Sequence, residues 1–293
     1  MITATAIPRL HHHRGRTLAL GLAAALGALV VAASPAMAGG WNVTMDLAAF
    51  SENTYPGSGE SYLTALPSLR ATRTEGLTTW FVHLPGRGLG VSRVDPSTGL
   101  TGTFAANFGG ERGPDQYSVV GFAVDHDAAT RARLAGAPTV STPLFLEASL
   151  EYPAASGLLG ATLAYHPTSI EGRPGGLDDQ TRHGLLLSLE YTRPLRITDR
   201  LLVAGRVGLE LMDGSYASAW FGLEHATATL ARHDAGAGLR DVQASVFANY
   251  QVSSHVGLML YYGGELLLGD AADSPYTVDS YQQTYLLGTS YSF

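Results

Sequence analysis

The chain has 293 residues with 45% hydrophobic content, a formal net charge of −7 at pH 7, and neither cysteine nor lysine. The absence of cysteine excludes disulfides, a thiol nucleophile and thiolate metal sites, and the acidic balance argues against a nucleic-acid partner, because phosphate binding needs a basic surface. No stretch after residue 38 holds 18 consecutive apolar residues, which excludes a helical membrane protein.

Residues 1–38 are typical of a secretory signal peptide. A basic N-terminal region with three arginines precedes an apolar run over 18–33, and Ala36-Met37-Ala38 has the small residues that a signal peptidase reads. A retained membrane anchor is the alternative, but the run is short and rich in alanine and glycine. Cleavage after Ala38 would leave a mature chain of 39–293. This chain contains 15 arginines and 25 acidic residues, so its net charge would be −10.

The mature chain shows a repeated two-residue alternation. Segments such as 144–152, 185–191, 201–211 and 242–252 place apolar side chains on one face and polar or small ones on the other, which is typical of strands crossing a bilayer at a tilt. We predict an all-β fold, a transmembrane antiparallel β-barrel of about twelve strands: 41–50, 61–73, 77–84, 88–94, 100–108, 139–152, 157–167, 182–195, 200–211, 237–251, 255–268 and 281–293.

The strand count depends on Pro85-Gly86-Arg87-Gly88, which we interpret as a tight turn. If it were only a bulge, two strands would merge and the even number would be lost, so ten strands is the alternative. A β-sandwich or closed barrel in water would also alternate, but its outer face would carry more charge than these strands do.

The connections alternate between short turns and long loops rich in Gly, Pro and Asp. Outer-membrane barrels have short periplasmic turns and long outer loops, so both termini are expected at the periplasmic rim. Tyr152, Tyr191, Tyr250 and Phe293 fall at the same end of strands running in one direction, where they would form an aromatic belt. The chain ends with Tyr291 and Phe293 on the apolar face of the last strand, which resembles the assembly signal of outer-membrane barrels.

The polar face of the strands would line the lumen. Its charged members would have to be paired or wetted, so either Arg–Glu networks plug the lumen or a narrow water-filled pore has an acidic lining. Lumen candidates are Glu147, Glu151, Glu190, Arg206, Glu210 and Glu265, with Gln243, Asn249, Gln251 and Arg70 as further members.

Several segments resemble one known family. The stretches 214–223, 236–242 and, most specifically, Leu267-Leu268-Gly269-Asp270-Ala271-Ala272-Asp273-Ser274-Pro275 are similar to motifs of the MltA-interacting protein (MipA/OmpV) family, and Tyr55 to Glu60 resembles a diverged further motif. Ala219-Trp220 and Pro56 depart from the family pattern. The motif residues are Gly214, Tyr216, Phe221, Gly222, Gly269, Asp270, Asp273, Ser274 and Pro275.

The resemblance implies a non-enzymatic protein of the Gram-negative outer membrane. It implies a scaffold that links a murein transglycosylase to a peptidoglycan synthase, with outer-membrane lipid and the barrel-assembly machinery as further partners. A narrow porin-like channel for small solutes is the alternative function. The family brings no cofactor and no catalytic residues.

Other polar clusters are expected to have structural roles. Asp270 and Asp273 could chelate a cation, and Asp125-His126-Asp127 resembles a metal or proton-transfer cluster, but loop capping explains both better. Ser254-His255 and the segment 166–169 supply the atoms of a hydrolase without the spacing of a triad. We therefore predict neither a metal site nor a catalytic site.

Overall fold

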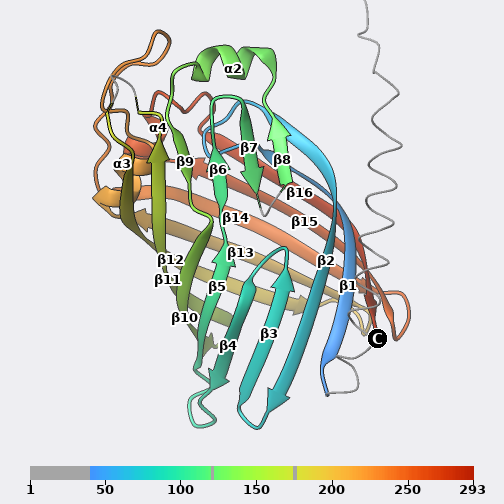
Figure 1. The fold of residues 1–293 in the computed structure, drawn as a ribbon. Coiled ribbons are helices and arrows are strands. Elements are labelled where there is room, and N and C mark those ends of the chain that lie inside the picture. Colours follow the sequence, from blue (N-terminus) through green and yellow to red (C-terminus); the bar gives the residue numbers. More distant parts are fainter. Residues whose placement is uncertain (1–39, 120–121, 174–176) are drawn as a thin grey trace, which may run out of the picture.

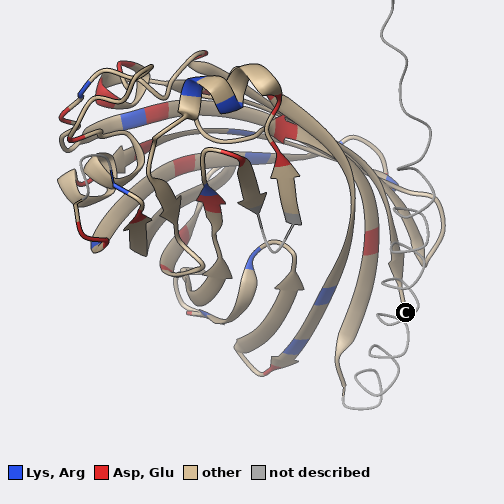
Figure 2. Ribbon diagram, turned by 45° about the horizontal axis from the view of Figure 1, so that its top comes forward, with Lys and Arg blue, Asp and Glu red and all other residues tan. Residues whose placement is uncertain are grey.

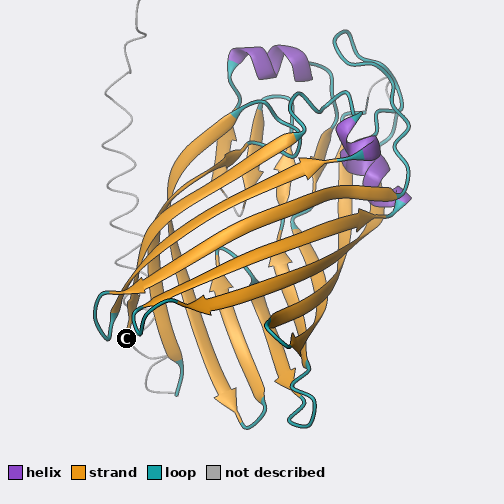
Figure 3. Cartoon of the chain, turned by 180° about the vertical axis from the view of Figure 1, so that it is seen from behind, coloured by secondary structure: helices purple, strands orange, loops and turns teal. Residues whose placement is uncertain are grey.

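The computed structural model describes residues 40–119, 122–173 and 177–293, so the predicted signal peptide lies outside the described residues. Twelve strands form one closed antiparallel barrel (Figures 1 and 3), in which each strand pairs with two neighbours, β1 with β16 and β10 with β11. The predicted fold is confirmed. The strands are β1 (Asn42–Asn53), β2 (Ser61–Glu75), β3 (Thr78–Leu84), β4 (Gly88–Val94), β5 (Thr101–Phe108), β10 (Leu144–Ala154), β11 (Gly157–Glu171), β12 (Gln180–Arg196), β13 (Leu201–Met212), β14 (Gly238–Gln251), β15 (Val256–Leu267) and β16 (Tyr281–Ser292).

The outer face of the barrel wall is apolar. Large hydrophobic side chains such as Leu150, Leu163, Val207 and Leu287 are between 46% and 63% exposed, and within 40–119, 122–173 and 177–293 no second layer covers them. Exposed apolar surface of this extent is stable only against lipid. The alternative of a β-sandwich with an inward apolar face is therefore wrong. Among the described residues, no helix is long and apolar enough to cross a membrane.

The two ends of the barrel differ, as the loop lengths predicted. At the short-turn end, brief connections join β2 to β3, β4 to β5, β10 to β11, β12 to β13 and β14 to β15. Phe293 lies at this end, where its backbone N–H donates to the carbonyl oxygen of Val43 at 3.1 Å. The other end, called the loop end, carries the long connections and all the described helices (Figure 3).

The loop end contains more structure than the sequence predicted. The segment 109–138, expected to be a loop, forms strands and a helix, and the predicted strand 139–152 is divided at Thr142-Pro143, because proline cannot donate to the ladder. Gly109 lies opposite the break and donates its N–H to the carbonyl of Pro143 at 3.3 Å. The additional elements are β6 (Gly110–Arg112), β7 (Gln116–Val119), β8 (Phe122–Asp125), α2 (Ala128–Leu134), β9 (Thr139–Ser141), α3 (Gly214–Trp220) and α4 (Gly269–Ala272).

The hairpin of β3 and β4 confirms the predicted turn and excludes the ten-strand alternative. Gly88 pairs with His83 and has a φ of +67°, and a Cβ on Gly88 would lie 2.0 Å from the carbonyl oxygen of Ala106. The wall at this turn therefore accepts only glycine, for both conformational and steric reasons.

We expect Gly88→Ala to destabilise the barrel by about 1–3 kcal/mol more than Gly76→Ala. Gly76 has a similar φ of +59° but open space at its Cβ position, so its replacement carries only the conformational cost of about 1–2 kcal/mol. Denaturant unfolding of both variants in lipid vesicles measures the difference, and equal midpoints would show that the contact with Ala106 is readily relieved.

Candidate functional site: the lumen and its cap

Charged residues gather in the lumen below the loop end around Arg240. Its guanidinium lies 3.0 Å from Glu210, 2.5 Å from Asp241 and 3.2 Å from Glu265. The Asp241 side chain is fully buried and that of Arg240 is 12% exposed. One guanidinium thus holds three carboxylates that would otherwise repel each other in a poorly solvated place.

A β-bulge brings Arg240 into this cluster. Glu210 pairs with Asp241 while the next residue, Leu211, pairs with Leu239, so Arg240 has no partner opposite it on β13. The extra residue turns two consecutive side chains toward the lumen. Strict alternation placed Arg240 on the lipid side and so missed it. The signal was available, because adjacent Arg and Asp in a membrane strand would otherwise put one charge into lipid.

The remaining predicted lumen residues are spread along the wall. Arg206 lies 3.3 Å from Glu190 and donates to Thr192, Glu147 accepts from the amide of Asn107, and Glu151 is opposite Thr101 and Gly160. Arg70, on β2, donates hydrogen bonds to the Asp46 carboxylate at 2.8 and 2.9 Å. The structure therefore brings Glu210 and Glu265 together, through Arg240 and not through Arg206.

Above this network the loops pack into a cap, which consists of residues 54–60, 109–119, 122–143, 213–237 and 268–280. Tyr55, Leu134, Leu223 and Tyr276 form one apolar cluster and are each at most 2% exposed. They come from four connections distributed around the barrel, so the loops meet across the mouth of the lumen. A second cluster packs α3 against the inner side of the strands; it includes Leu186, Met212, Tyr216, Ala217, Trp220, Phe221, Leu267 and Ala271.

Arg112 lies at the junction of the two clusters. It is 2% exposed, donates to the carbonyl oxygen of Trp220 at 2.7 Å, and has its guanidinium 3.7 Å from the centre of the Tyr276 ring. Burial lowers the pKa of Arg112. Stacking on an aromatic face partly offsets the lost solvation. Arg133 adds hydrogen bonds to the carbonyls of Pro275 and Tyr276.

The family-motif residues build this cap. The Ser274 hydroxyl donates to the carbonyl of Phe221 at 2.7 Å, and Asp270 accepts from the backbone N–H of Gly236 at 2.6 Å. A Cβ on Gly222 would lie 2.6 Å from the carbonyl oxygen of Ser218. Gly214 begins α3, Gly269 begins α4 with a φ of +52°, Asp273 follows α4, and Pro275 accepts from Arg133.

The Asp125-His126-Asp127 segment has a structural role at the edge of the cap. Glu60, just before β2, lies 2.8 Å from His126 Nδ1 and accepts from the backbone N–H of Asp127 at 2.7 Å. Asp127 in turn caps α2 by accepting from Thr130 N–H, a bond that lowers the pKa of Asp127. Among the described residues, no group of three or more His, Asp or Glu side chains could hold a metal ion.

The two groups of residues considered for hydrolysis lie at opposite ends of the barrel. Ser254 Oγ and His255 Nδ1 are 3.0 Å apart in an exposed turn at the short-turn end, whereas His166 stacks on Phe145 in the wall near the loop end, with ring centres 4.5 Å apart.

We expect the cap to loosen at high pH. Burial raises the pKa of Tyr216 to about 12, and it also raises the pKa of Tyr55, Tyr117 and Tyr276 above the ordinary value of 10.0. The folded cap holds these protons more tightly than the unfolded chain, so its stability is complete below pH 10 and falls as the pH rises toward 12. Tyrosinate absorbance should show late-titrating phenols, one fewer in Tyr216→Phe. Titration of all tyrosines near pH 10 would contradict the packing of the cap.

A closed antiparallel barrel with an apolar outer wall, a charged lumen and one long-looped end defines a transmembrane β-barrel of the bacterial outer-membrane class. The family model described as MltA-interacting protein MipA matches residues 47–293, and the chain belongs to this family.

Several solved barrels resemble the chain at low sequence identity. The translocator domain of autotransporter NalP from Neisseria meningitidis is 13% identical with a TM-score of 0.42, covering 87% of this chain and 88% of that one. A Pseudomonas aeruginosa FadL homologue is 9% identical with a TM-score of 0.39, covering 86% and 89%. OmpT of Vibrio cholerae, folded in vitro, is 9% identical with a TM-score of 0.38, covering 86% and 97%.

Because these TM-scores are low, the class rests on the barrel's own geometry and on the family match. A search of curated protein sequences finds no match to this chain.

Proposed function

We propose that this protein is a non-enzymatic scaffold of the Gram-negative outer membrane that binds a murein transglycosylase at its periplasmic, short-turn end. The family description names MltA as the interacting protein. The observation that carries the proposal is the charge difference between the two ends (Figure 2). The short-turn end has more arginines than carboxylates, namely Arg73, Arg93, Arg193, Arg196 and Arg200 against Glu75, Asp95, Glu151 and Asp199, on a mature chain of net charge −10.

The connection between β12 and β13 is the strongest candidate for the docking surface. Arg193, Arg196 and Arg200 are all exposed and lie within eight residues of each other around this turn. The turns themselves are too short to form a folded binding domain, so recognition would use charge and the flat rim of strand ends. Complementary charge of this kind directs association and is sensitive to salt. A peptidoglycan synthase would then be recruited through the same end or through the transglycosylase.

The test is binding of a purified lytic murein transglycosylase to the barrel in nanodiscs. We expect saturable binding that weakens about tenfold or more in a variant with Arg193→Gln, Arg196→Gln and Arg200→Gln, because three exposed charges are removed together. The matched control, Arg131→Gln with Arg232→Gln at the loop end, removes exposed arginines from the opposite side and should bind normally. No binding by the wild-type barrel, or equal loss in both variants, would contradict the proposal.

A narrow channel is the second candidate, and the lining of the lumen favours it. Eight carboxylates on the barrel strands face inward against four arginines, so ions that crossed would be mainly cations. The carboxylates are Asp46, Glu52, Glu147, Glu151, Glu190, Glu210, Asp241 and Glu265, and the arginines are Arg70, Arg182, Arg206 and Arg240. Arg87, in the turn between β3 and β4, adds a further positive charge. The cap opposes this function, because solute must pass between its packed clusters. Conductance across a planar bilayer decides between the two candidates.

A further inference from the structure

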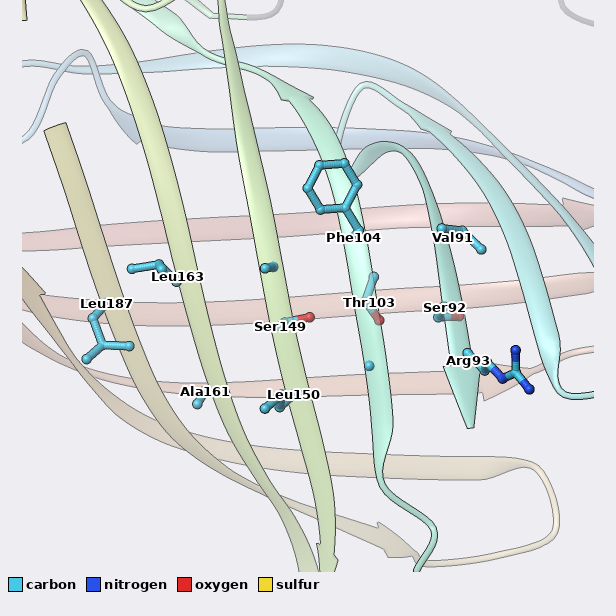
Figure 4. A pocket seen from close by; sticks show the side chains of 12 residues that line it. Val91, Ser92, Arg93, Thr103, Phe104, Ser149, Leu150, Ala161, Leu163 and Leu187 are labelled. Atoms are coloured by element: carbon cyan, nitrogen blue, oxygen red, sulfur yellow. The ribbon is translucent and has the colours of Figure 1, made fainter. Parts of the chain in front are cut away.

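The lipid-facing wall is hollowed by two adjoining grooves on the side formed by β4, β5 and β10 to β13. Their volumes are about 590 and 650 Å³, and they share Leu150 and Ala161. Figure 4 shows the residues that line the first groove, with Leu187 at one side, Leu150 and Phe104 in the middle, and Arg93 at the opposite side. The linings are almost entirely apolar.

The grooves arise from the order of large and small side chains across neighbouring strands. In the strand register Phe104 pairs with Ala148, which pairs with Leu163, and Gly102 pairs with Leu150, which pairs with Ala161. Small residues therefore form the floor between larger apolar side chains. Acyl chains in the bilayer would have to enter these grooves, since an unfilled apolar hollow loses the contacts of its whole lining.

Arg93 gives the first groove a charged end. It lines the groove, is exposed, and lies two residues before the turn that begins at Asp95. Among the ion pairs of the described residues, none includes Arg93. A guanidinium on the lipid face near the rim is stable when it reaches an anion at the level of the lipid headgroups.

Aromatic residues mark the same level. Tyr152 and Tyr191 line the second groove, and Tyr152 is 51% exposed. Trp80, on the strand next to Arg93, is 49% exposed. Amphipathic rings of this kind are enriched where lipid headgroups meet the hydrocarbon. Both grooves therefore run from the headgroup level at the short-turn end into the hydrocarbon region.

We propose that the two grooves hold one phospholipid, with an acyl chain in each groove and its phosphate on Arg93. The planar guanidinium can bind two phosphate oxygens at once. An anionic headgroup is favoured over a zwitterionic one, because it carries no ammonium group to compete for the phosphate. Leu150, which lines both grooves, separates the two acyl chains. The lipid site requires only a barrel that spans the bilayer, so it does not depend on the proposed binding of a transglycosylase.

The test is native mass spectrometry of the folded barrel released from micelles that contain phosphatidylglycerol or phosphatidylcholine. We expect the wild-type barrel to retain one lipid and to prefer phosphatidylglycerol. Arg93→Gln should lower the retained phosphatidylglycerol about tenfold, since a charge-assisted contact is lost, and should remove the preference. A variant that fills the floor of the grooves, Ala148→Leu with Ala161→Leu, keeps Arg93 but should retain neither phosphatidylglycerol nor phosphatidylcholine.

Arg193→Gln is the matched control, because Arg193 is exposed at the same end and lines neither groove. It should retain lipid as the wild type does. Heat-modifiable migration on gels confirms that each variant is folded before it is measured. Equal loss in Arg93→Gln and Arg193→Gln would overturn the site in favour of unspecific attraction. A dimer that the floor variant disrupts would overturn it in favour of contact between copies.

Discussion

Arg240→Met is expected to destabilise the barrel by about 3–5 kcal/mol, the cost of removing one partner from a buried ion pair. The change leaves Glu210, Asp241 and Glu265 close together without a counterion, and the Asp241 side chain is fully buried. Methionine retains most of the side-chain volume, so the loss reports charge rather than packing. Denaturant unfolding in lipid vesicles at neutral pH measures it.

Two further variants make this result specific to the network. Arg206 has a side chain that is 49% exposed and a guanidinium 3.3 Å from Glu190, so Arg206→Met should cost less than about 1 kcal/mol. Adding Asp241→Asn to Arg240→Met should restore part of the lost stability, because it removes one unpaired charge. A cost for Arg240→Met no larger than that for Arg206→Met would mean that water, and not Arg240, stabilises the carboxylates.

Phe221→Ala is expected to loosen the cap by about 3–5 kcal/mol, the usual cost of truncating a buried phenylalanine. Phe221 is 1% exposed, and its carbonyl oxygen accepts from the Ser274 hydroxyl. Hydrogen exchange of the cap segments should therefore become about a hundredfold faster or more, while the strands of the barrel keep their protection.

Val278→Ala is the matched control for the cap. Val278 lies at the same end and is 58% exposed, so its truncation should change exchange in the cap very little. If Phe221→Ala left exchange unchanged, the loops would not form one packed unit. If it instead unfolded the strands as well, the cap and the barrel would be one cooperative unit.

The barrel could be predicted from the sequence because the residues of each strand, taken alone, already show a strand pattern. A two-residue period such as that of Val242 to Val252 needs no knowledge of the partner strand, and the turn at Pro85 to Gly88 is read from proline and glycine alone. The terminal Tyr291 and Phe293 then indicated the class, and the family resemblance found the motif residues of the loops. All these signals lie within short stretches of the sequence, which is why the strands of the barrel wall could be predicted from it.

The cap and the Arg240 cluster could not be predicted in the same way. The core around Tyr55, Leu134, Leu223 and Tyr276 joins four loops that are far apart in the sequence, and no periodic pattern links them. Tyr216, Phe221 and Ser274 were recognised as motif residues, but their role in packing follows only from the fold. Arg240 was missed because a β-bulge turns its side chain from the lipid face of the strand to the lumen face. A strict two-residue alternation cannot predict such an inserted residue.

Single-channel recording of the wild-type barrel in a planar bilayer tests most directly whether the protein acts as a capped scaffold. A cap whose clusters span the mouth predicts a current that stays at the baseline of the empty bilayer, with insertion confirmed by protection of the strands from protease. Clear and reproducible cation-selective current steps from the folded wild-type protein would contradict a closed cap and favour the channel.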